Sequence, residues 1–184
     1  MKDRSARRAF RMAGLAVLAL AAFRPIQARS IVQVPNQDYL TETEAARIRD
    51  AENTNERIHL FLEFAADRLH RFQQQLTLPH PGPRHADILR DLLEAFASCM
   101  DDAAGRVADG RDRGEDVRRG AAELKKRAGE FLNLLEKWRR TAPQGAPYAD
   151  ALEDAVDAVQ QALQTAEAPS RARHRNPGRS GGLP

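Results

Sequence analysis

The chain has 184 residues, enough for one domain of ordinary size, and its single cysteine, Cys99, excludes an intramolecular disulfide. Its formal net charge of +3 comes from residues 1–28, which hold six Lys and Arg residues and one acid, whereas the remainder holds 23 basic and 25 acidic residues. The chain beyond residue 28 is therefore slightly acidic, which argues against a nucleic-acid-binding protein.

Residues 1–28 have the pattern of a cleavable export signal. A basic stretch precedes the uninterrupted apolar run 12–23. Twelve helical residues span about 18 Å, too short for a hydrocarbon core of about 30 Å. Ile26 and Ala28 suit the pocket of a signal peptidase, so we expect cleavage after Ala28 and a periplasmic or secreted protein. The alternative, an amphipathic or buried N-terminal helix, lacks polar residues at helical spacing within the run.

The export route stays open. Residues 7–10, RRAF, resemble the twin-arginine signature, and Arg24 after the apolar run also fits it. Ala6 and Arg11 depart from that pattern. The sequence is therefore compatible with two routes. They are the twin-arginine route, which exports folded proteins, and the general secretory route.

The region after the signal begins with a short extended lead, residues 29–40. Thr41 and Glu44 then have the spacing of a capping box, in which a hydroxyl and a glutamate satisfy the first free N–H groups of a helix. This pattern predicts a short helix over 42–51.

A second helix start follows at residues 53–56, NTNE. Beyond it, apolar residues recur at intervals of three and four, as on the buried face of a helix. These residues are Ile58, Phe61, Leu62, Ala65, Leu69, Phe72 and Leu76. Prolines 79, 81 and 83 end the pattern.

Two further stripes follow. The first ends before Gly110, which suits a helix C-terminus. Its members are Ile88, Leu92, Ala95, Phe96, Cys99, Ala103 and Val107. The second, over roughly 115–140, has strict heptad spacing, typical of helices that pack at shallow crossing angles. Its members are Val117, Ala121, Leu124, Ala128, Phe131, Leu135 and Trp138.

The last stripe follows a loop that ends at Pro147. Its members are Tyr148, Leu152, Val156, Val159, Leu163 and Ala166. Four main helices with short loops predict an all-α fold, an up-down-up-down four-helix bundle over 41–168 with a short N-terminal helical extension. Residues 169–184 are basic and rich in Pro and Gly, and we expect a disordered tail.

The segment 38–69 contains D-Y-L-T-E, then I-R-D-A, then N-x-R-I. In these motifs it resembles a group of uncharacterised exported bacterial helical proteins. The resemblance implies export and a helical fold, and it implies no activity.

Glu56 and His59 form an E-x-x-H, the spacing that carboxylate-bridged di-iron bundles use in pairs. On a helical wheel both residues, with Glu63 and His70, lie away from the apolar stripe, and no second E-x-x-H occurs. We therefore expect a solvated flank and assign no metal-ligating residue.

Other cofactor and enzyme signatures are also weak. The sequence contains no C-x-x-C-H for haem attachment, and no histidine falls on an apolar stripe. Met100 lies at the margin of its stripe, and Cys99 at the stripe centre is expected to be a buried core residue rather than a nucleophile. We assign no cofactor-binding residue, no catalytic residue and no cofactor.

Several charged clusters are interpreted as solvated surface. They are Asp101-Asp102, Lys125-Lys126-Arg127, Trp138-Arg139-Arg140 and the tail residues Arg171, Arg173, Arg175 and Arg179.

The leading hypothesis is a non-enzymatic exported protein that binds or scaffolds a protein or envelope component. One alternative is a metal- or cofactor-binding bundle, and another is a peripheral binder of anionic lipid or polymer through the tail. Self-association of the chain stays open.

Overall fold

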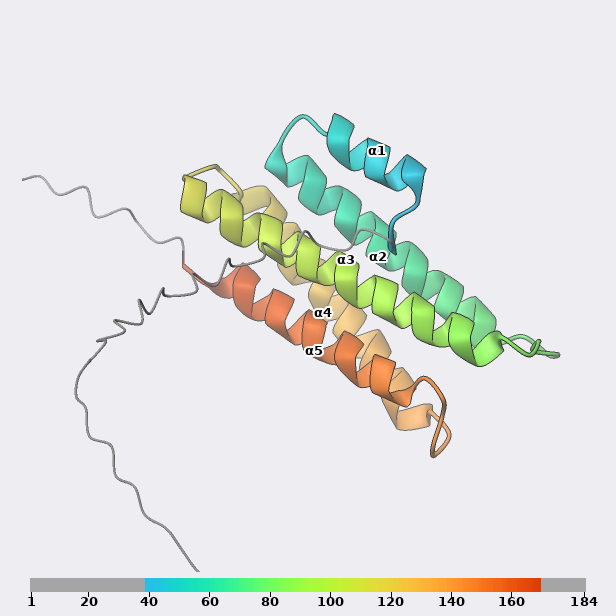
Figure 1. Ribbon diagram of the computed structural model, residues 1–184. Coiled ribbons are helices and arrows are strands. Elements are labelled where there is room, and N and C mark those ends of the chain that lie inside the picture. The colour runs from blue at the N-terminus through green and yellow to red at the C-terminus, as the bar shows by residue number, and fades with distance from the viewer. Residues whose placement is uncertain (1–38, 170–184) are drawn as a thin grey trace, which may run out of the picture. The chain divides into compact units, whose positions relative to one another are not determined.

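The computed structural model describes residues 39–169, and all regular secondary structure within that range is helical (Figure 1). The all-α prediction is confirmed. The helices are α1 (Glu42–Asp50), α2 (Thr54–Leu76), α3 (His85–Arg113), α4 (Arg118–Thr141) and α5 (Ala149–Glu167).

The first two helices begin at the predicted caps. Thr41 Oγ1 accepts the Glu44 N–H at 3.2 Å, and Glu44 Oε2 accepts the Thr41 N–H at 2.8 Å, which completes the capping box of α1. Asn53 Oδ1 accepts the Glu56 N–H at 3.0 Å at the start of α2. Each bond satisfies an N–H group that the helix itself leaves free.

Helix α3 is longer than predicted. It passes through Gly110, the predicted end, and stops at Gly114, whose φ of 74° is the left-handed conformation that glycine adopts without strain. Gly110 is buried, and a Cβ there would collide with Val117 Cγ1. Gly110 therefore serves a close approach between the end of α3 and the chain leading into α4.

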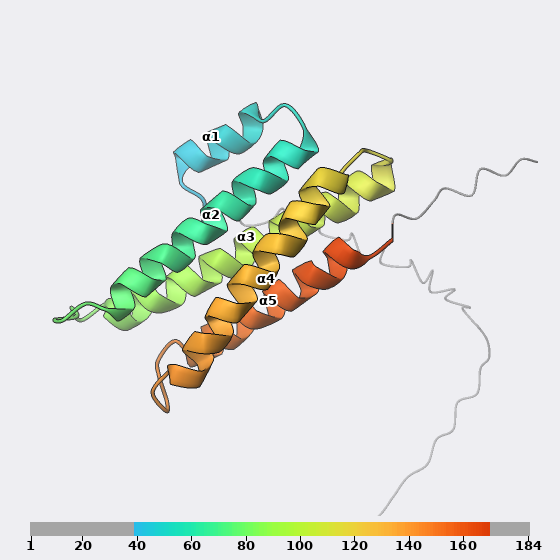
Figure 2. The same cartoon turned by 180° about the vertical axis from the view of Figure 1, so that it is seen from behind.

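Four of the helices pack lengthwise on one another. Helix α2 packs on α3 and, less extensively, on α4, while α5 packs on α3 and α4 (Figures 1 and 2). Helices α3 and α4 follow each other in sequence yet barely touch. The short connection 114–117 therefore joins helices that lie diagonally opposite, and α2, α3, α5 and α4 follow one another around the core.

The core contains the predicted faces of α2, α4 and α5 and a shifted face of α3. All seven predicted heptad residues of α4 are buried. In α3 the prediction is wrong at the N-terminal end: Ile88 is 40% exposed and Leu92 half-buried, whereas Leu89 and Leu93 are buried. Met100, predicted at the margin, is fully buried.

Helix α1 explains a second buried face on α2. Leu60 and Phe64 lie off the predicted stripe but are buried, and α1 packs on α2. The Arg47 guanidinium lies 5.3 Å from the centre of the Phe64 ring, a cation–π contact. The extension thus covers apolar surface on α2 that would otherwise face water.

None of the helices between residues 39 and 169 is long and apolar enough to cross a membrane. The predicted export signal and most of the lead, residues 1–38, lie outside the described residues, as does the tail from residue 170.

Candidate functional site

The residues singled out for metal chemistry lie on the exposed side of α2 and are paired separately. His59 Nδ1 lies 2.7 Å from Glu123 Oε1 on α4. Glu56 Oε2 accepts the Glu52 N–H at 2.8 Å. Glu63 accepts two bonds from the Arg47 guanidinium, at 3.0 and 3.1 Å. Within residues 39–169, no three His, Cys, Asp or Glu side chains are grouped so that they could hold a metal ion.

Glu56 and His59 do share a polar cleft. The cleft has a volume of about 420 Å³ and is lined by Glu52, Asn53, Asn55, Glu56, His59, Arg119 and Glu123. The lining offers carboxylates, amides, one guanidinium and one imidazole, with no hydroxyl or thiol nucleophile among these seven residues. The His70 side chain is outside it, 3.4 Å from Gln74.

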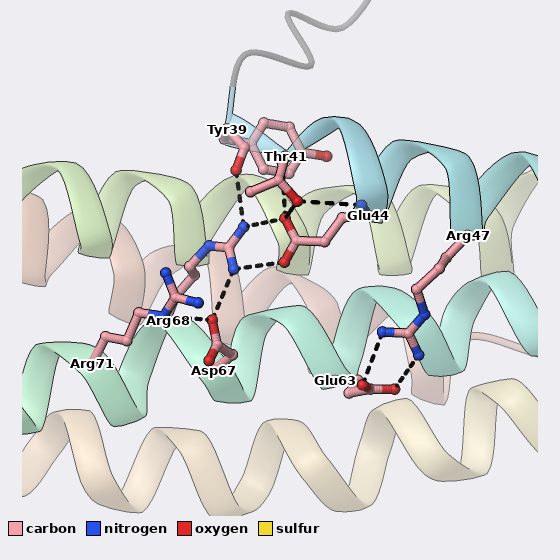
Figure 3. A network of polar contacts seen from close by, with 8 residues as sticks. All are labelled: Tyr39, Thr41, Glu44, Arg47, Glu63, Asp67, Arg68 and Arg71. Atoms are coloured by element: carbon pink, nitrogen blue, oxygen red, sulfur yellow. Dashed lines mark hydrogen bonds and ion pairs between the residues drawn. The ribbon is translucent and has the colours of Figure 1, made fainter.

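The most buried polar side chain of the described region is Arg68, which is 5% exposed. Its guanidinium donates to both Glu44 carboxylate oxygens, at 2.6 and 2.8 Å, and also to the Tyr39 carbonyl oxygen at 3.1 Å (Figure 3). Asp67 accepts a further bond at 3.0 Å. Arg68 therefore ties the start of α1 to the middle of α2.

The pKa of Glu44 records the strength of this pairing. Burial alone would raise the pKa, but hydrogen bonds from Arg68 and Thr41 outweigh it and lower the pKa of Glu44 to about 2. The same bond to Glu44 raises the pKa of Arg68, against the effect of burial. Both groups stay charged near neutrality.

Tyr39 connects the same region to α3. Its hydroxyl donates to Asp102, and its pKa is raised by burial and by that bond. Asp102, which the sequence showed only as part of an acidic pair, thus has a structural partner.

Cys99 is fully buried close to these groups. Burial raises the pKa of the Cys99 thiol to about 12, although the positive charge of Arg68 opposes the shift. The protonated thiol is a poor nucleophile. The burial of Cys99 agrees with the prediction that it occupies a core position.

A second polar junction joins α2 to the start of α4. Asn55 Nδ2 donates to the Asp116 carbonyl at 2.7 Å, and Asn55 Oδ1 accepts the Gly120 N–H at 2.7 Å. The residue at the N-cap position of α4, Val117, supplies no side-chain cap. Asn55 therefore caps α4 from another helix.

The motifs D-Y-L-T-E, I-R-D-A and N-x-R-I map onto these junctions. Tyr39 and Thr41 lie in the Arg68 region, while Asn55 caps α4. Arg57 donates to the carbonyl of the buried Ala51 at 3.2 Å, which fixes the corner between α1 and α2. Tyr39, Asn55 and Arg57 of these motifs thus hold helices and connections together.

The remaining predicted clusters are dispersed. Lys125 pairs with Glu167 at 3.0 Å, and the Arg127 guanidinium lies 5.0 Å from the Phe131 ring centre. Arg139 pairs with two glutamates, while Trp138 is buried. The four tail arginines lie outside the described residues.

Sequence reasoning missed the roles of Arg68 and Tyr39. Leu60, Phe64 and Arg68 recur every fourth residue, which marks a second face on α2. That spacing could have predicted a second buried face on α2. It was missed because its third residue, Arg68, is charged and does not read as part of an apolar face.

Comparison of the chain with protein-family models, with curated proteins and with solved structures gives no match.

Proposed function

We propose that this chain is an exported, non-enzymatic helical protein that acts by binding or scaffolding in the bacterial envelope. The observation that supports this proposal is the use made of its polar residues. Tyr39, Glu44, Arg68, Asp102 and Asn55 all pair with partners on other helices or connections. Among residues 39–169, no buried side-chain nitrogen or oxygen lacks a hydrogen-bond partner.

The fold proposed for this role is an up-down-up-down four-helix bundle of α2 to α5, with α1 as an extension. Short connections reverse the chain between successive helices, and the diagonal link between α3 and α4 leaves α2 beside α4 and α3 beside α5. Such a body presents long helix faces on which a partner can dock.

Export is proposed from the signal pattern of residues 1–28. Expression in a bacterium with fractionation should recover a protein that starts at Arg29 in the periplasm or medium. Replacing Arg7 and Arg8 by Lys should block export if the twin-arginine route is used and leave it unchanged if the general route is used. Retention of residues 1–28 by the cytoplasmic protein would contradict export.

The binding role is tested by cross-linking in the intact envelope. In a Cys99→Ala background, cysteines are placed one at a time on exposed helix positions, such as Gln160 on α5 and Asn133 on α4, and we expect a discrete cross-linked species only at the positions that face the partner. The purified protein should be colourless and free of stoichiometric metal. A Soret band, bound metal or catalytic turnover would overturn the proposal.

A further inference from the structure

Two loops lie at the same end of the packed helices. They are residues 77–84, between α2 and α3, and residues 142–148, between α4 and α5 (Figures 1 and 2). Aromatic contacts join the elements beside them: the ring centres of Phe72 and Trp138 are 4.9 Å apart, and those of Phe72 and Tyr148 are 5.4 Å apart. We call the surface formed by residues 70–88 and 137–149 the loop end.

The loop end is positively charged, unlike the rest of the described chain. Residues 70–88 and 137–149 together hold five Lys and Arg residues and one acid, Asp87. The other described residues hold 13 Lys and Arg residues against 23 Asp and Glu residues. The loop end is therefore net positive because acidic residues are scarce there, whereas the rest of the described region is net negative.

Three of these cations are free to meet a ligand. Arg84, Lys137 and Arg140 are exposed, and none forms an ion pair with another residue between 39 and 169. Arg71 and Arg139 are paired with carboxylates on neighbouring turns.

The loop end also carries exposed apolar side chains. Leu78 is 46% exposed and Ile88 is 40% exposed, and they are the large exposed hydrophobic residues of the described region. Both line one hollow of about 340 Å³, and its lining is completed by Gln75, Gly82, Pro83, Arg84 and His85. Apolar groups and an unpaired cation thus share one surface.

We propose that the loop end docks on an anionic lipid bilayer, with Leu78 and Ile88 entering the interface and Arg84, Lys137 and Arg140 contacting lipid phosphates. Charge complementarity selects the anionic surface, because the rest of the described region is acidic and is repelled by it. The exposed apolar side chains select lipid over a soluble polyanion, because only the bilayer offers them an apolar environment.

This inference deepens the proposed binding role, on which it rests, by naming the partner. It differs from an anchor in the basic tail, because it assigns the contact to residues 70–88 and 137–149.

The test is co-sedimentation with vesicles, using protein recovered from the periplasm or medium of an exporting host so that every variant has the same N-terminus. Vesicles of phosphatidylcholine alone are compared with vesicles that also contain phosphatidylglycerol. We expect binding to the anionic vesicles only, and weakening at high salt because screening shortens the reach of the charges.

Two variants address the loop end. In Arg84→Gln/Lys137→Gln/Arg140→Gln, partitioning should fall by about a hundredfold, since each cation near an anionic surface contributes about fivefold. Leu78→Ser/Ile88→Ser should weaken binding while leaving its salt dependence unchanged. The matched control Arg49→Gln/Arg119→Gln/Lys126→Gln removes three exposed cations elsewhere and should bind as the native protein does.

Equal binding to both kinds of vesicle, or equal loss in the control variant, would overturn the inference. So would a chain ending at residue 169 that no longer binds, since the tail would then be the anchor. Binding to heparin in place of vesicles would point to a polyanion and also contradict it. If vesicle binding fails while the envelope cross-link persists, the proposed binding function stands and only the lipid assignment falls.

Discussion

Arg68 on α2 holds the start of α1 in place through its guanidinium group. It is buried and meets the partly covered Glu44 carboxylate through two hydrogen bonds, so the Arg68 charge is kept from water while α1 is docked. A buried ion pair contributes little compared with a well-packed apolar pair, but removing one partner leaves an uncompensated charge. The pair therefore acts mainly by specifying where α1 docks.

Glu44→Gln should lower the free energy of unfolding by about 3 kcal/mol, because Arg68 then keeps its charge without its main counter-charge. Urea denaturation followed by circular dichroism measures the change. The control is Glu63→Gln, which breaks the exposed pair with Arg47 and should change the free energy by about 0.5 kcal/mol. Equal effects of the two substitutions on the free energy of unfolding would contradict the prediction, because they would show that loss of the buried pair costs no more than loss of the exposed one.

The same pair gives a pH dependence of defined sign. Since the pKa of Glu44 is lowered from 4.5 to about 2 in the folded protein, its contribution is present above pH 4.5 and is lost as the pH falls towards 2. The stability difference between the native protein and Glu44→Gln should therefore shrink across that interval. Denaturation midpoints measured from pH 6 to pH 2 test this, and a difference independent of pH would contradict it.

Cys99 should be unreactive in the folded protein. Its thiol is fully buried and its pKa is raised to about 12, so little thiolate exists near neutrality. A chromogenic disulfide reagent should label it only at the rate of unfolding, and labelling should become fast in urea. Rapid labelling without denaturant would mean that the Tyr39 and α1 region opens readily.

Two glycines in α4 test helix packing as a matched pair. A Cβ at Gly120 would lie 2.6 Å from Ile58 Cδ1, whereas nothing lies within 4 Å of a Cβ at Gly129. Gly129→Ala should raise the free energy of unfolding by about 0.5–1 kcal/mol through helix propensity. Gly120→Ala should lower it by about 1–3 kcal/mol, because Ile58 is fully buried and must shift.

Thermal and urea denaturation of both variants provide the measurement. Adding Ile58→Val, which removes the Cδ1 atom, should recover part of the loss in Gly120→Ala. A stabilising Gly120→Ala would mean that α2 and α4 do not approach as closely as described.

How far the elements follow from the sequence differs from helix to helix. The heptad of α4 offers one apolar face, and every residue predicted on that face is buried. In α3 the adjacent pairs Ile88–Leu89 and Leu92–Leu93 allow two faces one residue apart. Periodicity cannot choose between them, since the choice depends on where α2 and α5 lie.

The candidate site was less predictable than the fold. The E-x-x-H residues were placed correctly on an exposed flank, but Arg68 and Asn55 act through partners 24 to 65 residues away. Such pairings depend on the docking of α1 and on the approach of α4. The spacing of Leu60, Phe64 and Arg68 marks a second face on α2 but does not identify the element that covers it, and the approach of α4 leaves no local pattern in one sequence. The diagonal order of α3 and α4 is hidden for the same reason.

At the scale of the whole molecule, the described region is an acidic helical body with a basic, partly apolar end. It holds 18 Lys and Arg residues against 24 Asp and Glu residues, whereas the segments on either side of it are basic. The overall charge of +3 therefore describes none of these parts. Binding at a charged envelope surface would depend on orientation rather than on net charge.

The central claim, an exported protein without a cofactor, is tested most directly by native mass spectrometry of protein recovered from the periplasm or medium of an exporting host. The account predicts the mass of residues 29–184, alone or as an integral multiple, with no metal or cofactor adduct. A species that retains residues 1–28, or one that carries a stoichiometric metal or cofactor lost on denaturation, would contradict it.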